Sequence, residues 1–172
     1  ALQYAFRYCR SLQELPALDI PAATNIQYLF GYCNAAAKSG GINAPNASAS
    51  STFTSCYALR NINLNSKSGC SLGDAENLAQ AVLDVTGTSV SIGTPPHTLQ
   101  RLIIKSDNTA FVGTALPLSA TSIGRGAALE LFNALPTISS TKTITLSQTP
   151  AAKDLTDDDV AIVVAKGWTV SK

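Results

Sequence analysis

The chain has 172 residues, of which 45% are hydrophobic and only 13% are charged, and its formal net charge is +1. Soluble domains usually carry about 25% charged residues, so Ser, Thr, Asn, Gln and Ala must cover most of this surface. The absence of a basic run argues against nucleic-acid binding, and no apolar stretch reaches the roughly 18 residues of a membrane-spanning helix. The hydrophobic content also argues against a disordered chain.

Three copies of one short phrase, a phenylalanine followed three positions later by a cysteine, occur near the start of the chain. The copies begin at Phe6, Phe30 and Phe53, and their cysteines are 24 and then 23 residues apart. A period in the twenties predicts a solenoid, in which each repeat is one unit stacked on the next. Such arrays usually serve as binding or structural surfaces.

The first 70 residues are predicted to alternate between helix and strand. In the stretch from 22 to 33, the apolar residues Ile26, Leu29 and Phe30 recur at spacings of three and four, which is typical of a helix. The elements expected in chain order are a helix over 22–33, a short extended piece over 42–45, a helix over 47–57 and a strand over 59–64.

Residues 71–150 are predicted to form longer and less regular units. The most clearly patterned helix covers 74–85, where Leu78, Val82 and Val85 lie on one stripe and Gly87 follows as an end signal. The remaining elements expected here are a strand over 99–104, an irregular connection over 111–123, a helix over 125–135 and a strand over 142–147.

Residues 151–172 are predicted to close the array as a C-terminal cap. Thr156 is a natural N-cap for a helix over 156–165, and Asp157 to Asp159 occupy its first turn, where the helix dipole favours acidic groups. Gly167 is expected to end this helix, and Trp168 to Val170 to form a final short strand.

Helices of this length between strands imply a parallel sheet, so the predicted class is α/β. Short parallel strands are expected on one face of the array and helices on the other. We expect a single domain over 1–172, with regular repeats over 1–70, irregular repeats over 71–150 and the cap over 151–172. The chain contains no methionine, and residue 1 falls inside a repeat, so we expect a fragment with more repeats upstream.

The repeated phrase resembles the BspA-type leucine-rich repeat. The pattern Phe-x-x-Cys-x-x-Leu-x-x-Leu is complete as Phe6, Cys9, Leu12 and Leu15, and again, with Ile last, as Phe53, Cys56, Leu59 and Ile62. The copy at Phe30 departs from it, because Ala36 stands where Leu is expected and a Lys-Ser-Gly-Gly insertion follows. The segment from Leu155 to Val170 is similar to the closing segment of many such proteins.

This resemblance implies a leucine-rich-repeat solenoid and a class of role. Members of the family are surface adhesins of bacteria, or tail and fibre components of phages, and are not enzymes. The first prediction is therefore a non-enzymatic module on a phage virion, in a tail fibre, receptor-binding or decoration protein. Its expected partners are a protein or glycan on a host cell surface, or other virion proteins, and homo-oligomerisation through regions outside this chain is left open.

Two alternatives remain at this point. The module can belong to a bacterial cell-surface adhesin, or it can be an accessory domain of a hydrolase that acts on glycans. A hydrolase needs paired carboxylates in a cleft, and the only acidic cluster in the sequence is the expected helix cap at Asp157 to Asp159.

Tyrosines are the candidate binding residues. Tyr8 and Tyr32 occupy the same repeat slot, one position before the cysteine, and Tyr57 follows Cys56 directly. Stacked, exposed tyrosines can bind sugars or a protein, because a tyrosine offers a large contact area at a low entropic cost. We predict Tyr8, Tyr32 and Tyr57 as surface binding residues, and packing between repeats is the alternative.

No catalytic residue, cofactor site or metal site is predicted. The single histidine, His97, has no cysteine near it in sequence and is expected in a solvent-facing loop. Asp157 to Asp159 run consecutively, whereas calcium loops place their ligands at alternating positions. The cysteines are expected to be small buried residues of a tight layer, with a disulfide framework as the alternative.

Overall fold

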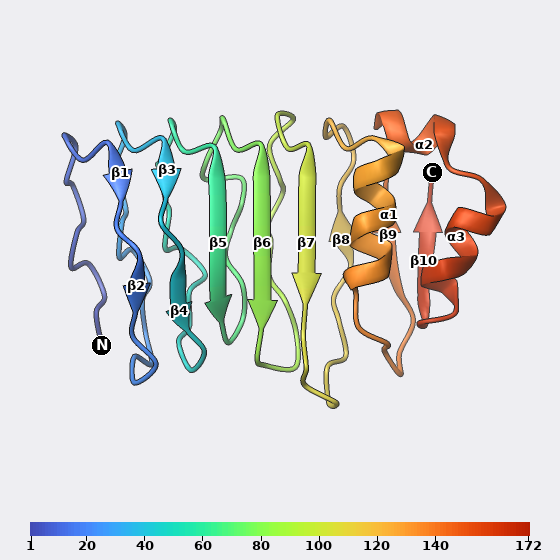
Figure 1. The fold of residues 1–172 in the computed structure, drawn as a ribbon, viewed down its shortest axis with the longest axis horizontal. Coiled ribbons are helices and arrows are strands. Elements are labelled where there is room, and N and C mark those ends of the chain that lie inside the picture. Colours follow the sequence, from blue (N-terminus) through green and yellow to red (C-terminus); the bar gives the residue numbers. More distant parts are fainter.

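The computed structural model describes all 172 residues. It is an α/β structure in which the strands lie side by side along the longest axis (Figure 1). The strands are β1 (Glu14–Leu15), β2 (Leu18–Asp19), β3 (Lys38–Ser39), β4 (Ile42–Ala44), β5 (Asn61–Ser66), β6 (Gln80–Val85), β7 (Arg101–Lys105), β8 (Leu116–Pro117), β9 (Lys142–Thr145) and β10 (Trp168–Ser171), and the helices are α1 (Arg125–Ala134), α2 (Pro150–Asp154) and α3 (Asp157–Val164).

All strand pairings are parallel, which confirms the predicted class of sheet. The largest sheet has the order β2-β4-β5-β6-β7, so each strand pairs with the next one along the chain, and β1 pairs separately with β3. A second sheet, β10-β9-β8, lies at the C-terminal end. In Figure 1 the arrows of β8 and β10 point opposite to those of β1 to β7, because they belong to the layer behind.

The register of the large sheet places like residues in rows. Leu64 pairs with Ile42 on one side and with Leu83 on the other, and Leu83 pairs in turn with Ile104. All four side chains are buried. Rows of this kind join one continuous core of 43 buried residues that runs from Leu15 to Trp168.

The predicted helices over 22–33 and 47–57 are wrong. These stretches are successive turns in which the N–H of Leu29 donates to the carbonyl of Ile26 (3.1 Å), and Cys33 likewise to Phe30 (3.2 Å). A helix would instead join each N–H to the carbonyl four residues earlier. The turns bring every third or fourth side chain into the core, and this explains why their spacing resembled that of a helix.

The predicted helix over 74–85 is also wrong, because its second half forms β6. Ala81, Leu83 and Val85 point inward and are buried, whereas Val82 faces outward. The segment carries a period-two pattern beneath its helical one, and it pairs with β5 over six residues and with β7 over five. Pairing on both edges outweighs the helical propensity of its Ala, Glu and Leu residues.

The predictions for the C-terminal third agree better with the structure. Helices occur at 125–134 and 157–164, within the ranges expected, and Thr156 is the N-cap of α3, whose side chain accepts a hydrogen bond from the N–H of Asp159. The strands expected over 42–45, 59–64, 99–104, 142–147 and 168–170 correspond to β4, β5, β7, β9 and β10. The short elements β1, β2, β3, β8 and α2 were not predicted. Helices are therefore confined to this end and do not line the face opposite the strands.

Three long side chains hold the C-terminal helices together. The guanidinium of Arg125 makes a bidentate contact with Asp159 at 2.8 and 2.9 Å, and this contact holds the carboxyl pKa of Asp159 well below its ordinary value. The ammonium of Lys166 donates to three carbonyls at the C-terminal end of α1. Burial opposes this charge and lowers the pKa of Lys166. The indole of Trp168 donates to the carbonyl of Pro136 at 2.9 Å.

The cysteines of the repeated phrase lie in successive layers. We call each turn segment, together with the strands that follow it, a coil. The thiol of Cys33 donates to the carbonyl of Phe6 at 3.2 Å, and that of Cys56 donates to the carbonyl of Phe30 at 3.1 Å, so each thiol bonds to the preceding coil. Burial raises the pKa of Cys56 to about 12. All four cysteines are free thiols, so the disulfide framework left open by the sequence does not form.

The Lys-Ser-Gly-Gly insertion has a local reason. Lys38 and Ser39 form β3, which pairs with β1, and the chain then crosses close to the preceding coil. A Cβ at Gly40 would lie 2.5 Å from the backbone nitrogen of Ala17, and Gly41 has a φ of +92°. Only glycine fits this crossing without strain.

Candidate binding surface on the open sheet face

One face of the large sheet is open to solvent between β2 and α1. Because Ile62, Leu64 and Ser66 of β5 point into the core, the three asparagines that alternate with them, Asn61, Asn63 and Asn65, face outward. The register extends this pattern over β6 and β7 as three rows, which are Asn61, Gln80 and Arg101, then Asn63, Val82 and Ile103, and then Asn65, Asp84 and Lys105. We call this grid the open sheet face.

An amide ladder crosses this face along the third row. The amide nitrogen of Asn65 donates to the side-chain oxygen of Asn43 (3.0 Å), and Asn43 donates in turn to the carboxylate of Asp19 (2.7 Å). An ionised carboxylate can only accept, so Asp19 fixes the direction of both amides. The amide nitrogen of Asn65 is therefore turned toward β4, and on the other side, on β6, the register partner of Asn65 is Asp84. The side-chain oxygen of Asn65 is buried and has no hydrogen-bond partner.

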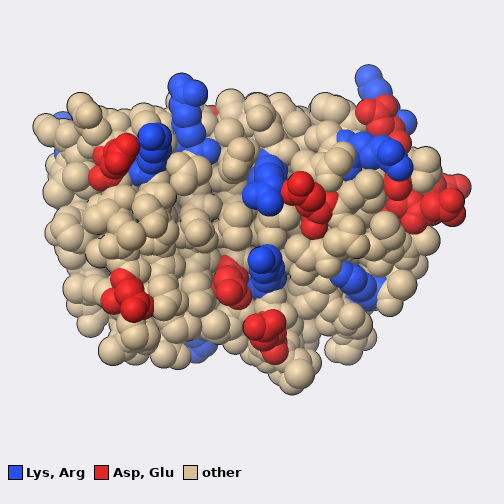
Figure 2. Space-filling model, viewed as in Figure 1, with Lys and Arg blue, Asp and Glu red and all other residues tan.

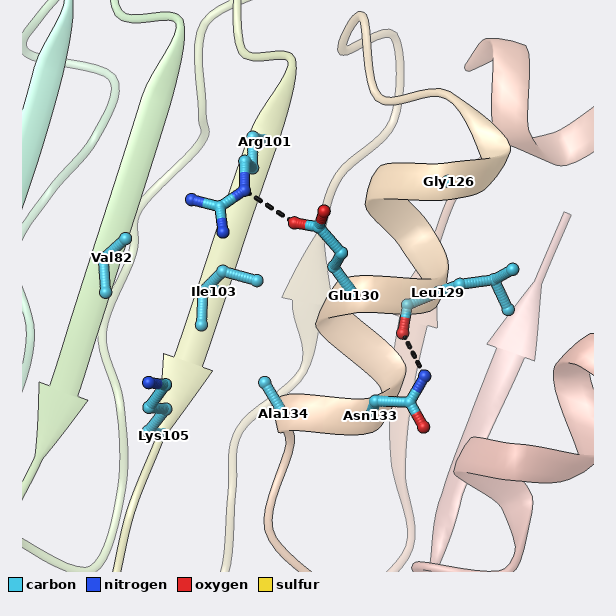
Figure 3. A pocket seen from close by; sticks show the side chains of 9 residues that line it. All are labelled: Val82, Arg101, Ile103, Lys105, Gly126, Leu129, Glu130, Asn133 and Ala134. Atoms are coloured by element: carbon cyan, nitrogen blue, oxygen red, sulfur yellow. Dashed lines mark hydrogen bonds and ion pairs between the residues drawn. The ribbon is translucent and has the colours of Figure 1, made fainter.

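Helix α1 forms a wall at one end of the open sheet face. It packs over β7, and this is why Ile103 is only 5% exposed although it points outward. Figure 3 shows Arg101 reaching from β7 to Glu130 on α1, where its Nε donates to the carboxylate at 2.6 Å. Two adjoining hollows meet here and share Val82 and Lys105, one beside α1 and the other over β2, β4 and β5.

The open sheet face is close to electrically neutral. In Figure 2 charged side chains are scattered over this side of the molecule, with wide uncharged areas between them. Arg101 is paired with Glu130, and Lys105 is the register partner of Asp84, so opposite charges stand next to each other. Such a surface suits an extended ligand that is rich in hydroxyl or amide groups and has little net charge.

The predicted tyrosines lie in the turn segments of the opposite layer. The rings of Tyr8 and Tyr32 stack with centroids 4.7 Å apart, as their shared repeat slot suggested. Tyr8 is 49% exposed, Tyr32 is half-buried, and Tyr57 is 44% exposed. Tyr57 belongs to no stacked pair, so the three residues include one pair and one separate ring.

Arg7 is part of the tyrosine cluster, and the sequence analysis did not single it out. Its guanidinium carbon lies 4.6 to 5.6 Å from the ring centroids of Tyr4, Tyr8, Tyr28 and Tyr32. Cation–π contacts of this kind contribute about 0.5 to 1 kcal/mol each at exposed sites. The chain's own arginine therefore occupies the space between these rings.

The other polar residues considered in the sequence, His97 and the acidic residues at the start of α3, do not come together in a site. His97 is exposed in a loop, and its Nδ1 lies 2.8 Å from the carbonyl oxygen of Ala120. Asp159 and Thr156 form a reciprocal capping box at the start of α3. No group of three or more His, Cys, Asp or Glu side chains is arranged to hold a metal ion. No helix combines the length and the apolar character needed to cross a membrane.

The amides of the open sheet face were missed, although their signal was present. Asn61, Asn63 and Asn65 alternate with Ile62 and Leu64 in and directly after the strand predicted over 59–64. The same alternation requires the intervening asparagines to form a polar row on the other side of the strand.

Comparison with family models, with curated proteins and with solved structures finds no match to this chain.

Proposed function

We propose that the chain is a leucine-rich-repeat solenoid that works as a non-enzymatic binding module, with the open sheet face as its binding surface. The single observation that carries this proposal is the continuous open face from β2 to α1, where amide and charged side chains flank apolar residues such as Val82 and where two adjoining hollows share Val82 and Lys105. The stacked coils and the alignment of Cys33 and Cys56 with the preceding layers support the solenoid.

The surface favours an extended neutral ligand. Five adjacent strands spaced about 4.8 Å apart give a track of about 19 Å. The exposed amide of Asn63 is not part of the ladder and offers both a donor and an acceptor on this track, and Asp84 forms no ion pair. A glycan or an extended peptide of a host surface, or a neighbouring virion protein, has matching chemistry.

The setting follows from the family resemblance. We propose a phage virion component, such as a tail fibre, receptor-binding or decoration protein, with a bacterial cell-surface adhesin as the alternative. Mass spectrometry of purified virions should detect the chain. Its absence from virions, together with its recovery from a bacterial surface fraction, would support the adhesin.

A catalytic role has less support on this face. Glu130 is held by Arg101, so it is not free to act with Asp84 as a pair of catalytic carboxylates. The hydrolase alternative predicts release of reducing ends from a bound polysaccharide, and a reducing-sugar assay that detects turnover would overturn the non-enzymatic proposal.

A glycan array followed by titration calorimetry tests the binding surface. With the best-bound glycan as the probe, Asn63→Lys should weaken binding at least tenfold, because a long charged side chain would obstruct the middle row. Tyr57→Ala, in the other layer, tests the sequence prediction that Tyr57 binds the ligand, and it should leave affinity unchanged if the open sheet face is the binding surface. The surface is wrongly assigned if Tyr57→Ala abolishes binding while Asn63→Lys preserves it.

A further inference from the structure

In the turn layer of the first three coils, eight backbone hydrogen bonds run from one coil to the next along the chain, and the N–H of Ser48, which donates to Thr24 at 3.1 Å, runs in the opposite direction. In the first coil four N–H groups donate to carbonyls of the second at 2.8 to 3.4 Å, from Leu2 to Asn25, Tyr4 to Gln27, Phe6 to Leu29 and Tyr8 to Gly31. The second coil repeats this toward the third at 2.7 to 3.1 Å, from Ile26 to Ser48, Tyr28 to Ser51, Phe30 to Thr52 and Tyr32 to Thr54.

This pattern comes from the backbone conformation. Tyr4, Tyr8, Tyr28 and Tyr32 have positive φ values between 56° and 66°, so left-handed residues recur within each coil. The N–H groups of Ala5 and Arg7 bond inside their own coil, to Leu2 and Tyr4. The edge that faces away from the second coil is therefore rich in carbonyls, whereas the edge of an ordinary strand offers donors and acceptors together.

That outer edge has unsatisfied groups. No donor reaches the carbonyls of Gln3, Ala5 and Arg7, although their counterparts Gln27, Leu29 and Gly31 each accept a bond. Side chains of the first coil are also more exposed than their counterparts in the second and third coils. Phe6 is 36% exposed, whereas the equivalent Phe30 and Phe53 are fully buried, and Cys9 is exposed, whereas Cys33 and Cys56 are buried. We call the surface from Gln3 to Cys9 the N-terminal face.

We propose that the N-terminal face is a docking surface for a further polypeptide coil of the same Tyr-x-Phe-x-Tyr-Cys type, lying parallel to residues 2–8. Such a coil supplies a row of N–H donors at the spacing of the open carbonyls, and it places a phenylalanine over Phe6. The Phe6–Phe30 stack at 5.3 Å and the Phe30–Phe53 stack at 6.3 Å show that this packing already repeats within the chain.

The direction of the carbonyls argues against a second copy of this chain as the occupant. Two N-terminal faces brought together would place carbonyl opposite carbonyl and leave both rows without donors. The partner must therefore present the opposite edge of a coil, the one that carries N–H groups. This inference goes beyond the proposed function, because it is independent of what the open sheet face binds.

The thiol of Cys9 reports occupancy of this face directly. It is the exposed cysteine, whereas Cys33, Cys56 and Cys70 are buried. Burial also raises the pKa values of Cys56 and Cys70 to about 12, which keeps them as unreactive thiols at neutral pH. Reaction with Ellman's reagent should therefore show one fast thiol per chain.

The test adds a second copy of residues 23–47 directly before Ala1, which places the added phenylalanine 23 residues before Phe6, with Cys33→Ser in the added copy only, so that no new reactive thiol is introduced. The added coil should slow the reaction of Cys9 at least 50-fold. A fusion carrying a scrambled sequence of the same composition is the matched control, and its Cys9 should react as fast as in the original chain.

A second measurement covers the case in which the fusion does not fold. A synthetic peptide of residues 23–47 with Cys33→Ser, added to the original chain, should protect Cys9 saturably, and the scrambled peptide should not. Equal Cys9 reactivity with the native and scrambled sequences in both formats would overturn the proposal. Sedimentation showing that the chain alone is a dimer with a protected Cys9 would overturn it in favour of a second copy.

Discussion

The two ends of the molecule build the layer behind the strands in different ways. Up to residue 56 this layer consists of turns whose remaining N–H groups bond to the neighbouring coil, whereas after residue 115 it consists of β8, β9 and β10 with α1 placed across the front. The turn layer at the N-terminal end depends on hydrogen bonds to the neighbouring coil. The C-terminal end is stabilised by its own side-chain contacts, such as that of Arg125 with Asp159. Stability at the N-terminal end should therefore depend on stacking, and at the C-terminal end on specific polar side chains.

The largest expected effect tests the dependence on stacking. Phe30 lies between Phe6 and Phe53 and is fully buried. Phe30→Ala should lower the free energy of unfolding by about 3 to 5 kcal/mol, the usual range for removing a buried aromatic ring. Phe6→Ala is the matched control and should cost clearly less, because that ring is already 36% exposed. Urea unfolding measures both, and equal costs would contradict the stacking account.

The next effect tests the C-terminal contacts. Lys166→Met keeps the apolar stem but removes three hydrogen bonds to the last carbonyls of α1. Leaving those carbonyls without a donor should cost about 1 to 3 kcal/mol. Lys67→Met changes an exposed lysine with no ion pair and should be nearly neutral. Loss of stability in the Lys67 variant alone would rule out this role for Lys166.

A smaller effect, in the stabilising direction, is expected on the open sheet face. Asp84→Asn would supply an amide donor to the unpartnered oxygen of Asn65 and so extend the ladder across β6. The gain should be about 0.5 to 1.5 kcal/mol, or about 1 to 6 °C in Tm for a chain of this length. Asp107→Asn, at an exposed loop position, controls for the lost charge. A lower Tm for Asp84→Asn would show that the ladder does not run toward β6.

The last effect emerges only in acid. Arg125 and the cap at Thr156 lower the pKa of Asp159 in the folded state from its ordinary value of 3.8. A carboxyl with a lowered folded pKa stabilises the fold above its unfolded pKa, and this contribution is lost as the pH falls through the folded value. Asp159→Asn should therefore flatten the fall in stability between about pH 5 and pH 2. Thermal unfolding across that range measures it, and parallel curves for both proteins would contradict it.

The comparison also explains which elements could be predicted from the sequence. The segment from 125 to 135 is rich in Ala and Leu, and 156–165 has a capping box, so local preferences and structure agree there. The stretch from 74 to 85 has equally helical residues, but the place of its second half between β5 and β7 makes that half the strand β6. Whether residues 80–85 form a helix or a strand depends on β5 and β7, which are distant in sequence, so a local sequence pattern cannot predict it.

The candidate surface was predictable only in part. The shared slot of Tyr8 and Tyr32 correctly indicated a stacked pair. The amide ladder required the register between β4 and β5, which depends on how many residues each turn segment consumes. The unpartnered oxygen of Asn65 could not be predicted from the register alone. It depends on the orientation of the Asn65 amide, which is fixed through Asn43 by Asp19, two strands away.

The left-handed tyrosines limit how this chain can vary in length. Inserting or deleting one residue between Tyr4 and Tyr8, or between Tyr28 and Tyr32, would shift the alternation and turn donors toward the wrong neighbour. Whole coils can be gained or lost without this penalty, because each one restores the same phase. Changes in length should therefore accumulate as whole coils or in the loops beyond the stacked rings. Insertions or deletions of one residue within a coil should be selected against, because they destabilise the stack.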